Sequence, residues 1–510
     1  MKPLLLFSLA SIVIASSLTS FCEGSLSQGL AYWRIRHRMH ELRRRQQHAE
    51  LWGSNPSLQG PASSRFMSFL RNVELKQPLD HLDPACNKTF KQRVWVNSLF
   101  WKRPHGPVFL YIGGESALSS NDVFVGQHVR LAHSHGALLV AAEHRFYGKS
   151  VNEEGLSDKN LRYLTISQAL VDLVRVHRYV SDEFGLKQGH VWVSFGGSYP
   201  GSLSAWFRLK HPELIHTAVA SSAPVQAQLD YAGYDEVVGQ SLRNSVVGGS
   251  DECVSSMREG FEHLDKLLEQ RKYEEVQNDF EACGSLQKAR DRATFVGTLA
   301  SVVMVAVQYD ELDSKHNIAE VCDKMTDRTV GEPYQRLAHL AKTHLLDDTK
   351  TCVQSSYDEY LLALQNEAAD PELSEMRQWF FQKCSEIGVF QSCYPERGCP
   401  FSRLLTLEAD VDVCVRVFGL SLQDVSRGVD STNRVYGANR PNGTRVIFVN
   451  GDIDPWHKLS VLKSLSPLLP AIVINGTSHC ADMETPKMND IYALRHARQE
   501  IEKQIVQWLQ

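Results

Sequence analysis

Ser198 lies at a turn between two short segments that differ in periodicity. Before it, residues 191–194 alternate and carry branched side chains as a short buried strand does; after it, residues 204–209 resume at helical spacing. A serine at such a turn is presented at the carboxyl edge of a sheet and at a helix N-terminus, where free backbone N–H groups can stabilise a developing oxyanion. Ser198 is therefore a candidate nucleophile.

The residues around Ser198 match the G-x-S-x-G pattern of a nucleophile elbow imperfectly. Gly196 stands two positions before the serine, but Pro200 occupies the position of the second glycine and Gly201 follows one residue later. Proline is tolerated in a first helical turn because its missing N–H has no partner there. The alternative interpretation is a glycine-rich turn that contains an incidental serine.

A serine hydroxyl becomes a useful nucleophile only when a histidine accepts its proton and a carboxylate orients that histidine. Two aspartates, Asp452 and Asp454, follow an apolar segment late in the chain, and His479 follows the next one. The order Ser, Asp, His is one of the known orders of such a triad. Spacing alone leaves both aspartates open as the acid. His457 is the weaker candidate for the base, since it lies on the loop of the acid itself.

Alternating helices and apolar segments must position these side chains. The predicted helices cover residues 121–134, 166–184 and 488–509, and the predicted strands cover residues 91–101, 108–112, 137–142, 191–194, 217–220, 446–449 and 471–474. Uninterrupted apolar strands between helices indicate a parallel sheet that is covered on both faces. Gly114 follows the strand at 108–112, where a backbone N–H can supply a second oxyanion donor.

Between residues 230 and 428 the sequence is rich in charge, periodic at helical spacing and contains eight of the eleven cysteines. We interpret it as a helical, disulfide-stapled insertion that splits the sheet and forms a wall over the site; an independent binding domain is the alternative. An exopeptidase would need a charged group in this insertion to bind the terminus of its substrate. The carboxylates available include Asp310, Glu311 and Asp313.

The first residues predict entry into the secretory pathway. An apolar run at 4–15 and small residues up to Gly24 are typical of a signal peptide. Loss of Cys22 leaves ten cysteines, an even number that suits disulfides, and Asn87, Asn442 and Asn475 begin glycosylation sequons. We expect the lumen of endosomes, lysosomes or other vesicles, or secretion. No later segment has the length of apolar sequence that a transmembrane helix requires.

The overall charge gives no reason to expect nucleic acid as a partner, because 510 residues carry a formal net charge of −5. Residues 25–65 are the local exception: they are rich in arginine, including three in a row at 43–45, and are interpreted as a basic leader or propeptide-like segment. A solvated helix face is the alternative. The oligomeric state is left open, a homodimer included.

Four ordered motifs resemble those of the family of lysosomal prolyl carboxypeptidase and dipeptidyl peptidase II. They are Glu143-His144-Arg145-Phe146-Tyr147-Gly148, Gly196-Gly197-Ser198-Tyr199-Pro200-Gly201, Asn450-Gly451-x-x-Asp454-Pro455-Trp456 and Gly476-x-x-His479. The resemblance implies an α/β-hydrolase fold with a helical cap, with Ser198 as nucleophile, Asp454 as acid and His479 as base. The resemblance leaves proline preference open, since the glycines that follow Asp-Pro-Trp in its proline-specific members are here residues 457–459, and a second histidine is here Cys480.

The domains expected on this basis are a signal peptide at 1–24, the leader at 25–65, an α/β-hydrolase domain at 66–228 and 431–510, and the helical cap at 229–430. The expected reaction is hydrolysis of short or unfolded peptides through an acyl-enzyme, with the backbone N–H groups of Tyr199 and Gly114 as oxyanion donors and no metal or organic cofactor. An esterase or lipase of the same fold and a noncatalytic binding protein are the rival hypotheses.

Overall fold

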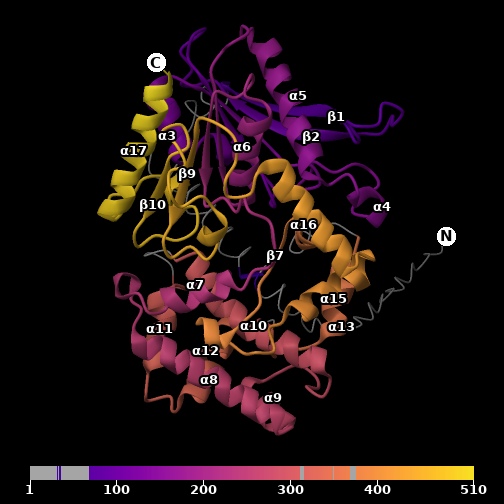
Figure 1. Cartoon of the computed structure of the whole chain (residues 1–510), viewed down its shortest axis with the longest axis vertical. Coiled ribbons are helices and arrows are strands. Elements are labelled where there is room, and N and C mark those ends of the chain that lie inside the picture. Colours follow the sequence, from indigo (N-terminus) through magenta and orange to yellow (C-terminus); the bar gives the residue numbers. More distant parts are fainter. Residues whose placement is uncertain are drawn as a thin grey trace, which may run out of the picture.

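An eight-stranded sheet forms the centre of the upper body in Figure 1. The computed structural model describes residues 32, 34, 35, 68–310, 315–347, 350–367 and 375–509, so the predicted signal peptide and nearly all of the leader lie outside the described residues. In spatial order the strands are β1 (Leu70–Pro78), β2 (Thr89–Asn97), β4 (Leu138–Ala142), β3 (Val108–Ile112), β5 (Trp192–Gly197), β6 (Thr217–Ser221), β9 (Val446–Gly451) and β10 (Ala471–Ile474).

From β4 to β10 the neighbouring strands are parallel, whereas β2 pairs antiparallel with both β1 and β4. The inner strands are almost wholly buried, which agrees with their uninterrupted apolar sequences. Parallel strands end at a common edge. The loops after β5, β9 and β10, which carry Ser198, Asp454 and His479, therefore converge there.

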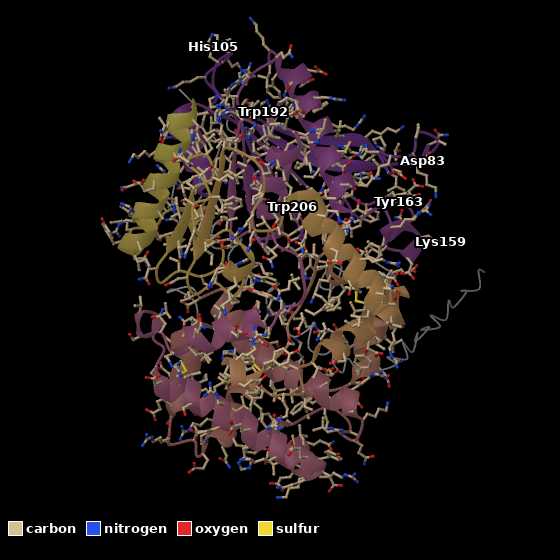
Figure 2. All side chains as sticks on the ribbon, viewed as in Figure 1. Asp83, His105, Lys159, Tyr163, Trp192 and Trp206 are labelled. Atoms are coloured by element: carbon tan, nitrogen blue, oxygen red, sulfur yellow. A yellow bond between two sulfur atoms is a disulfide. The ribbon has the colours of Figure 1, made fainter. Side chains whose placement is uncertain are left out.

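Helices cover both faces of the sheet, as Figure 1 shows. Helices α5 (Ile166–Phe184) and α6 (Tyr199–Lys210) pack in one apolar core, and α3 (Gln127–His135) and α17 (Tyr492–Leu509) pack in the other. The indoles of Trp192 on β5 and Trp206 on α6 are buried in the first core, inside the upper body in Figure 2. This arrangement is an α/β-hydrolase fold.

The chain between β6 and β9 forms the helical layer below the sheet in Figure 1. Its two short strands, β7 (Gln228–Asp230) and β8 (Gly388–Phe390), pair with each other. Its helices are α7 (Gly233–Ser241), α8 (Asp251–Glu269), α9 (Tyr273–Phe280), α10 (Ala289–Gln308), α11 (Ile318–Thr326), α12 (Pro333–Leu345), α13 (Tyr357–Gln365), α14 (Met376–Gln382), α15 (Leu407–Phe418) and α16 (Leu422–Tyr436). We call this layer the cap.

Eight cysteines of the cap form four disulfides. They join Cys253 to Cys322, Cys283 to Cys352, Cys384 to Cys414 and Cys393 to Cys399. Cys86 and Cys480, both outside the cap, are free thiols. The cysteines of the mature chain thus do not all pair, contrary to the expectation from their even number. Among the described residues, no helix has the length and apolar character needed to cross a membrane.

Candidate active site

Ser198 occupies the turn between β5 and α6 with left-handed backbone angles, φ 64° and ψ −135°. Its N–H donates to the carbonyl of Ser221 on β6 at 2.9 Å, which fixes the strained turn against the neighbouring strand. A Cβ on Gly196 would lie only 2.1 Å from the carbonyl oxygen of Pro200. The close return of the chain after the serine therefore requires glycine two positions before it.

Two further glycines explain why the imperfect motif still forms this turn. A Cβ on Gly201 would lie 2.7 Å from the carbonyl oxygen of Ser221, so helix α6 can approach β6 only with glycine at that position. A Cβ on Gly114 would lie 2.2 Å from Cγ of Pro200, which places the backbone of the loop after β3 against the first turn of α6. Tyr199 is the first residue of α6, and its N–H belongs to the set that has no acceptor within a helix.

Asp454 and His479 are in direct contact. Oδ1 of Asp454 lies 2.9 Å from Nδ1 of His479 and also accepts the N–H of Trp456 at 3.0 Å. Asp454 is fully buried. Asp452, by contrast, accepts the N–H of Gly476 at 2.8 Å and ties the loop after β9 to the loop after β10. Of the two aspartates that spacing left open, Asp454 is the one that contacts the histidine.

The cap holds the histidine loop in place. The N–H of His479 donates to the carbonyl of Gln308 at 3.2 Å, and the hydroxyl of Ser478 donates to the carbonyl of Val307 at 2.6 Å. Within the described part of the chain, Nε2 of His479 is buried without a hydrogen-bond partner. Burial acts to lower the pKa of His479, but the adjacent Asp454 carboxylate and Cys480 raise that pKa well above its ordinary value of 6.5.

The other histidine of this region, His457, does not contact the predicted nucleophile in any interaction seen here. It follows Asp454 in the same loop, its N–H donates to the carbonyl of that aspartate, and burial lowers its pKa. Cys480 directly follows His479 in the same loop. Its N–H donates to Oγ of Ser222 at 2.8 Å, and a Cβ on Gly197 would lie 2.8 Å from its sulfur, so the free thiol borders the turn of Ser198.

Ser198 opens into a cavity whose walls come from both the sheet and the cap. Gln308, at the end of α10, forms part of this wall, and its Oε1 accepts from the hydroxyls of Tyr32 and Tyr234 at 2.7 Å each and from Nε1 of Trp456 at 2.9 Å. A single amide oxygen of the cap thus accepts hydrogen bonds from Tyr32, from Tyr234 in the cap, and from Trp456 in the loop of Asp454. The cavity is assembled from segments that are far apart in sequence.

Acidic groups dominate the charge in this cavity. Among the lining residues that the structure describes, Glu115, Asp235 and Asp410 are acidic and Lys383 carries the single ammonium group. Asp235 is fully buried, and neither of its carboxylate oxygens has a hydrogen-bond partner among the described residues. Burial, with the charges of Asp410 and Glu236, raises the pKa of Asp235 well above its ordinary value. Burial likewise raises the pKa of Asp410, to about 6, and lowers that of Lys383.

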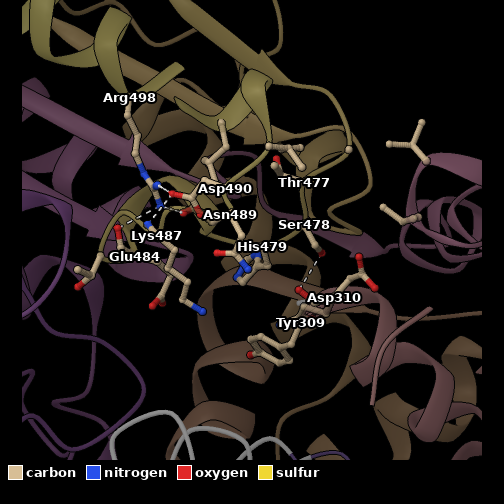
Figure 3. Close-up of a pocket in the computed structure, with 18 residues that line it drawn as sticks. Tyr309, Asp310, Thr477, Ser478, His479, Glu484, Lys487, Asn489, Asp490 and Arg498 are labelled. Atoms are coloured by element: carbon tan, nitrogen blue, oxygen red, sulfur yellow. Dashed lines mark hydrogen bonds and ion pairs between the residues drawn. The ribbon is translucent and has the colours of Figure 1, made fainter. Parts of the chain in front are cut away.

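A second cavity shares Gln308 and Tyr309 with the first and is also lined by His479 (Figure 3). Asp310 lines it, and burial raises the pKa of this carboxyl group to about 6. Oδ1 of Asp310 also accepts the N–H of Ile318 at 2.9 Å. Of the cap carboxylates considered from sequence, Asp310 therefore lies near the histidine, whereas Glu311 and Asp313 lie outside the described residues.

The segment Glu143–Gly148 contacts the first residue of α6 and the cap through its side chains. Both nitrogens Nε and Nη2 of Arg145 bind the buried Asp172, at 2.6 and 2.8 Å. Nε2 of His144 lies 3.1 Å from the hydroxyl of Tyr199, and the hydroxyl of Tyr147 donates to Oε1 of Gln382 in the cap at 2.6 Å. This motif therefore links the sheet, the turn of Ser198 and the cap.

Two residues of the site, Gln308 and Asp235, could not be found by sequence reasoning. Gln308 ends an apolar helix and resembles any polar residue at a helix terminus. Asp235 adjoins Glu236 in a helix of ordinary composition, and only the path of the cap chain reveals that one of these two acids lines the cavity of Ser198. The one weak signal was the expectation that the cap supplies a charged group.

Known proteins match most of this chain. The family model described as serine carboxypeptidase S28 matches residues 77–501. The thymus-specific serine proteases of Mus musculus and Homo sapiens are each 38% identical over 444 residues, with 85% of this chain covered and 87% and 86% of theirs. The lysosomal Pro-X carboxypeptidase of Bos taurus is 27% identical over 481 residues, covering 89% of this chain and 93% of its own.

Proposed function

Because this chain belongs to the serine carboxypeptidase S28 family and is a serine-type peptidase, we propose that Ser198, His479 and Asp454 are its catalytic residues. Ser198 attacks the peptide carbonyl while Nε2 of His479 takes the hydroxyl proton, and the same imidazole then gives that proton to the leaving amine. Water hydrolyses the resulting acyl-enzyme by the same route. Asp454 holds the imidazole through Nδ1 and stabilises its charged form.

The contact between Asp454 and His479 carries this proposal, since it leaves Nε2 of a buried histidine available to a hydroxyl. The N–H groups of Tyr199 and Gly114 are proposed as the oxyanion donors. Tyr199 begins a helix, and Gly114 packs against its second residue, Pro200. Both groups therefore border the position of the nucleophile.

A fluorophosphonate probe tests the nucleophile. We expect covalent labelling of the wild-type protein at Ser198, no labelling of Ser198→Ala, and unchanged secretion of that variant. Absence of labelling in the folded wild-type protein would favour the noncatalytic binding protein. Turnover of simple esters and lipids without cleavage of any peptide would instead favour the esterase or lipase alternative.

The substrate class follows from the acidic cavity. A buried carboxylate without a partner is costly unless a cationic group binds to it. Asp235 is such a group in the cavity of Ser198, so we infer that the substrate places an ammonium or guanidinium group there. A free N-terminal amine and a basic side chain share this chemistry.

Four peptides separate these two sources: one sequence with a free or an acetylated N-terminus, and with lysine or norleucine before the cleaved bond. Loss of cleavage on acetylation identifies the amine, and loss with norleucine identifies the side chain. Asp235→Asn should raise KM for the preferred peptide at least tenfold. Glu236→Gln, at a neighbouring residue that does not line the cavity, should not raise KM, because loss of its charge makes ionisation of Asp235 easier. Equal KM values for all four peptides would refute the cationic subsite and leave the triad untouched.

The cap also supports a limit on substrate size. The cap lies at the carboxyl edge of the sheet and Gln308 joins it to the loop of His479, so short or unfolded peptides are the proposed substrates. The same sequence should be cleaved as a free peptide and resist cleavage within a folded domain. Equal rates for both would contradict a restrictive cap.

For the compartment, we propose the endolysosomal lumen or secretion. Four disulfides are typical of proteins made in the oxidising secretory pathway. Asn87, Asn442 and Asn475 are all exposed, as glycosylation would require, and one relative is described as lysosomal. Glycosidase treatment should lower the apparent mass of the secreted or lysosomal protein, and a protein without sugar would contradict this placement.

A further inference from the structure

A cluster of two histidines and a glutamate lies in the cap, outside the acidic cavity around Ser198. His316 precedes α11, Glu320 lies in the first turn of α11, and His344 lies near the end of α12. One ligand atom of each residue lies within 4.8 Å of those of the other two. We propose that these three side chains bind a divalent transition-metal ion, with Zn²⁺ as the best match.

The distances are close to those of a tetrahedral site. Zinc–nitrogen and zinc–oxygen bonds of about 2.1 Å separate neighbouring ligand atoms by about 3.4 Å. Nε2 of His344 lies 3.1 Å from Oε2 of Glu320, and Nδ1 of His316 lies 3.9 Å from the same oxygen. The ligand atoms of the two histidines lie within 4.8 Å of each other, so an imidazole rotation that shortens this distance by up to about 1.4 Å would complete the geometry.

The environment of His316 fixes the nitrogen that it presents. Its Nε2 lies 2.9 Å from the carbonyl oxygen of Val302 in α10, and a carbonyl can only accept a hydrogen bond. The proton of the neutral ring is therefore on Nε2, and the lone pair is on Nδ1, which faces Glu320. A metal-binding histidine is commonly oriented by such a hydrogen bond from its other nitrogen.

The charges of the cluster also suit a cation. The carboxylate of Glu320 supplies the acidic ligand, and it lies between the imidazoles of His316 and His344. Lys324 is the competing cation, since its Nζ lies 3.4 Å from Oε1 of Glu320, and a bound metal must displace it. All three ligand side chains are between 11% and 26% exposed, which leaves access for the ion and for a water as fourth ligand.

A metal at this position would join three helices of the cap. His316 is anchored to α10, and the other two ligands lie on α11 and α12. Helix α10 ends at Gln308, whose carbonyl accepts the N–H of His479. The metal would therefore stabilise the part of the cap that holds the histidine loop. The sequence does not reveal this cluster, because its outer ligands are 28 residues apart and form no compact motif.

Calorimetric titration of the metal-free, full-length glycoprotein with Zn²⁺ tests this site. We expect one ion per chain, a rise in the thermal unfolding temperature, and visible absorption typical of tetrahedral coordination when Co²⁺ is used instead. His344→Ala and Glu320→Gln should each weaken binding at least tenfold. His339→Ala, an exposed histidine on the same helix, should not change it.

Lys324→Gln provides the opposite test, because removal of the competing ammonium group should tighten Zn²⁺ binding. His479→Ala should retain the full stoichiometry, which separates this site from metal captured by the catalytic histidine. Absence of Zn²⁺ binding by the wild-type protein would overturn the proposal, as would binding that persists at equal affinity in both His344→Ala and Glu320→Gln.

Discussion

At the scale of single residues, two aspartates in one loop have different tasks. Asp454 contacts His479, whereas Asp452 accepts a backbone N–H from the loop after β10. We expect Asp454→Asn to lower kcat by about 10⁴-fold, because an amide in contact with Nδ1 favours the wrong tautomer of the histidine. Asp452→Asn should cost much less, since it changes only the support of a loop. Steady-state kinetics on one peptide check this ranking, and the reverse ranking would reassign the acid.

The pH dependence of turnover belongs to the same residue pair. His479 must be neutral to accept the proton of Ser198, and its pKa is raised above 6.5. Acidification therefore protonates the base, so kcat/KM should fall as pH decreases, with a midpoint above 6.5 and a loss of at least about tenfold at pH 5. A profile that stays flat down to pH 5 would show that the histidine is not held in its charged form by Asp454.

This pH dependence bears on the proposed compartment. An acidic lumen keeps His479 protonated in the free enzyme, which restricts turnover there. Early endosomes, secretory vesicles and the cell exterior are less acidic and suit the base better. A substrate cation bound near Asp235 would add to this trend, because the carboxyl group must lose its proton to pair with the cation.

At the scale of elements, the approach of α6 to β6 determines the turn of Ser198. We expect Gly201→Ala to destabilise the protein by about 1–3 kcal/mol and to lower activity, because the added methyl group would meet the carbonyl of Ser221. Gly443→Ala is the control, since its added Cβ meets only a leucine side chain, at 3.3 Å. Chemical denaturation measures both variants. Equal stability of the two would mean that α6 has room to move.

The same helix shows where sequence reasoning succeeded and where it did not. The bounds of β3, α5 and β10 agree with the predicted segments, because each is an uninterrupted apolar or amphipathic run between turn residues. Helix α6 begins at Tyr199, five residues before the predicted periodicity, since Pro200 and Gly201 act there as first-turn and packing residues. The propensities of Pro200 and Gly201 indicated a break in the helix at these residues. In the structure both belong to the first turn of α6, where Gly201 packs against β6.

Two other elements differ for physical reasons. The predicted helix at 121–134 is divided into a short 3₁₀ turn, Ser120–Val123, and α3, because Gly126 adopts a φ of 106° between them. Strand β1 was missed, since its charged, half-exposed sequence lies at the edge of the sheet, where one partner strand suffices. The functional residues of the cap could not be predicted from sequence, because nonlocal packing alone places Asp235 in the cavity that Ser198 also lines.

At the scale of the whole molecule, the disulfides are confined to the cap and the two free thiols lie outside it. Alkylation of the mature protein under denaturing, nonreducing conditions should therefore modify two cysteines, Cys86 and Cys480, as peptide mass spectrometry can identify. Prior reduction should raise the number to ten. Modification of ten without reduction would contradict the oxidised cap and the secretory placement.

The position of Tyr32 bears on how substrate would enter the cavity of Ser198. This residue of the basic leader lines the cavity of Ser198, and its hydroxyl donates to Gln308 at 2.7 Å. A substrate that fills this cavity would have to displace Tyr32, and because Tyr32 is covalently attached, its effective concentration does not fall on dilution. A chain that lacks residues 25–65 should show a lower KM with an unchanged kcat, and a synthetic peptide of residues 25–45 should restore the higher KM as a competitive inhibitor. Removal of the leader by proteolysis would then act as a release from tethered inhibition, with the catalytic groups already in place beforehand.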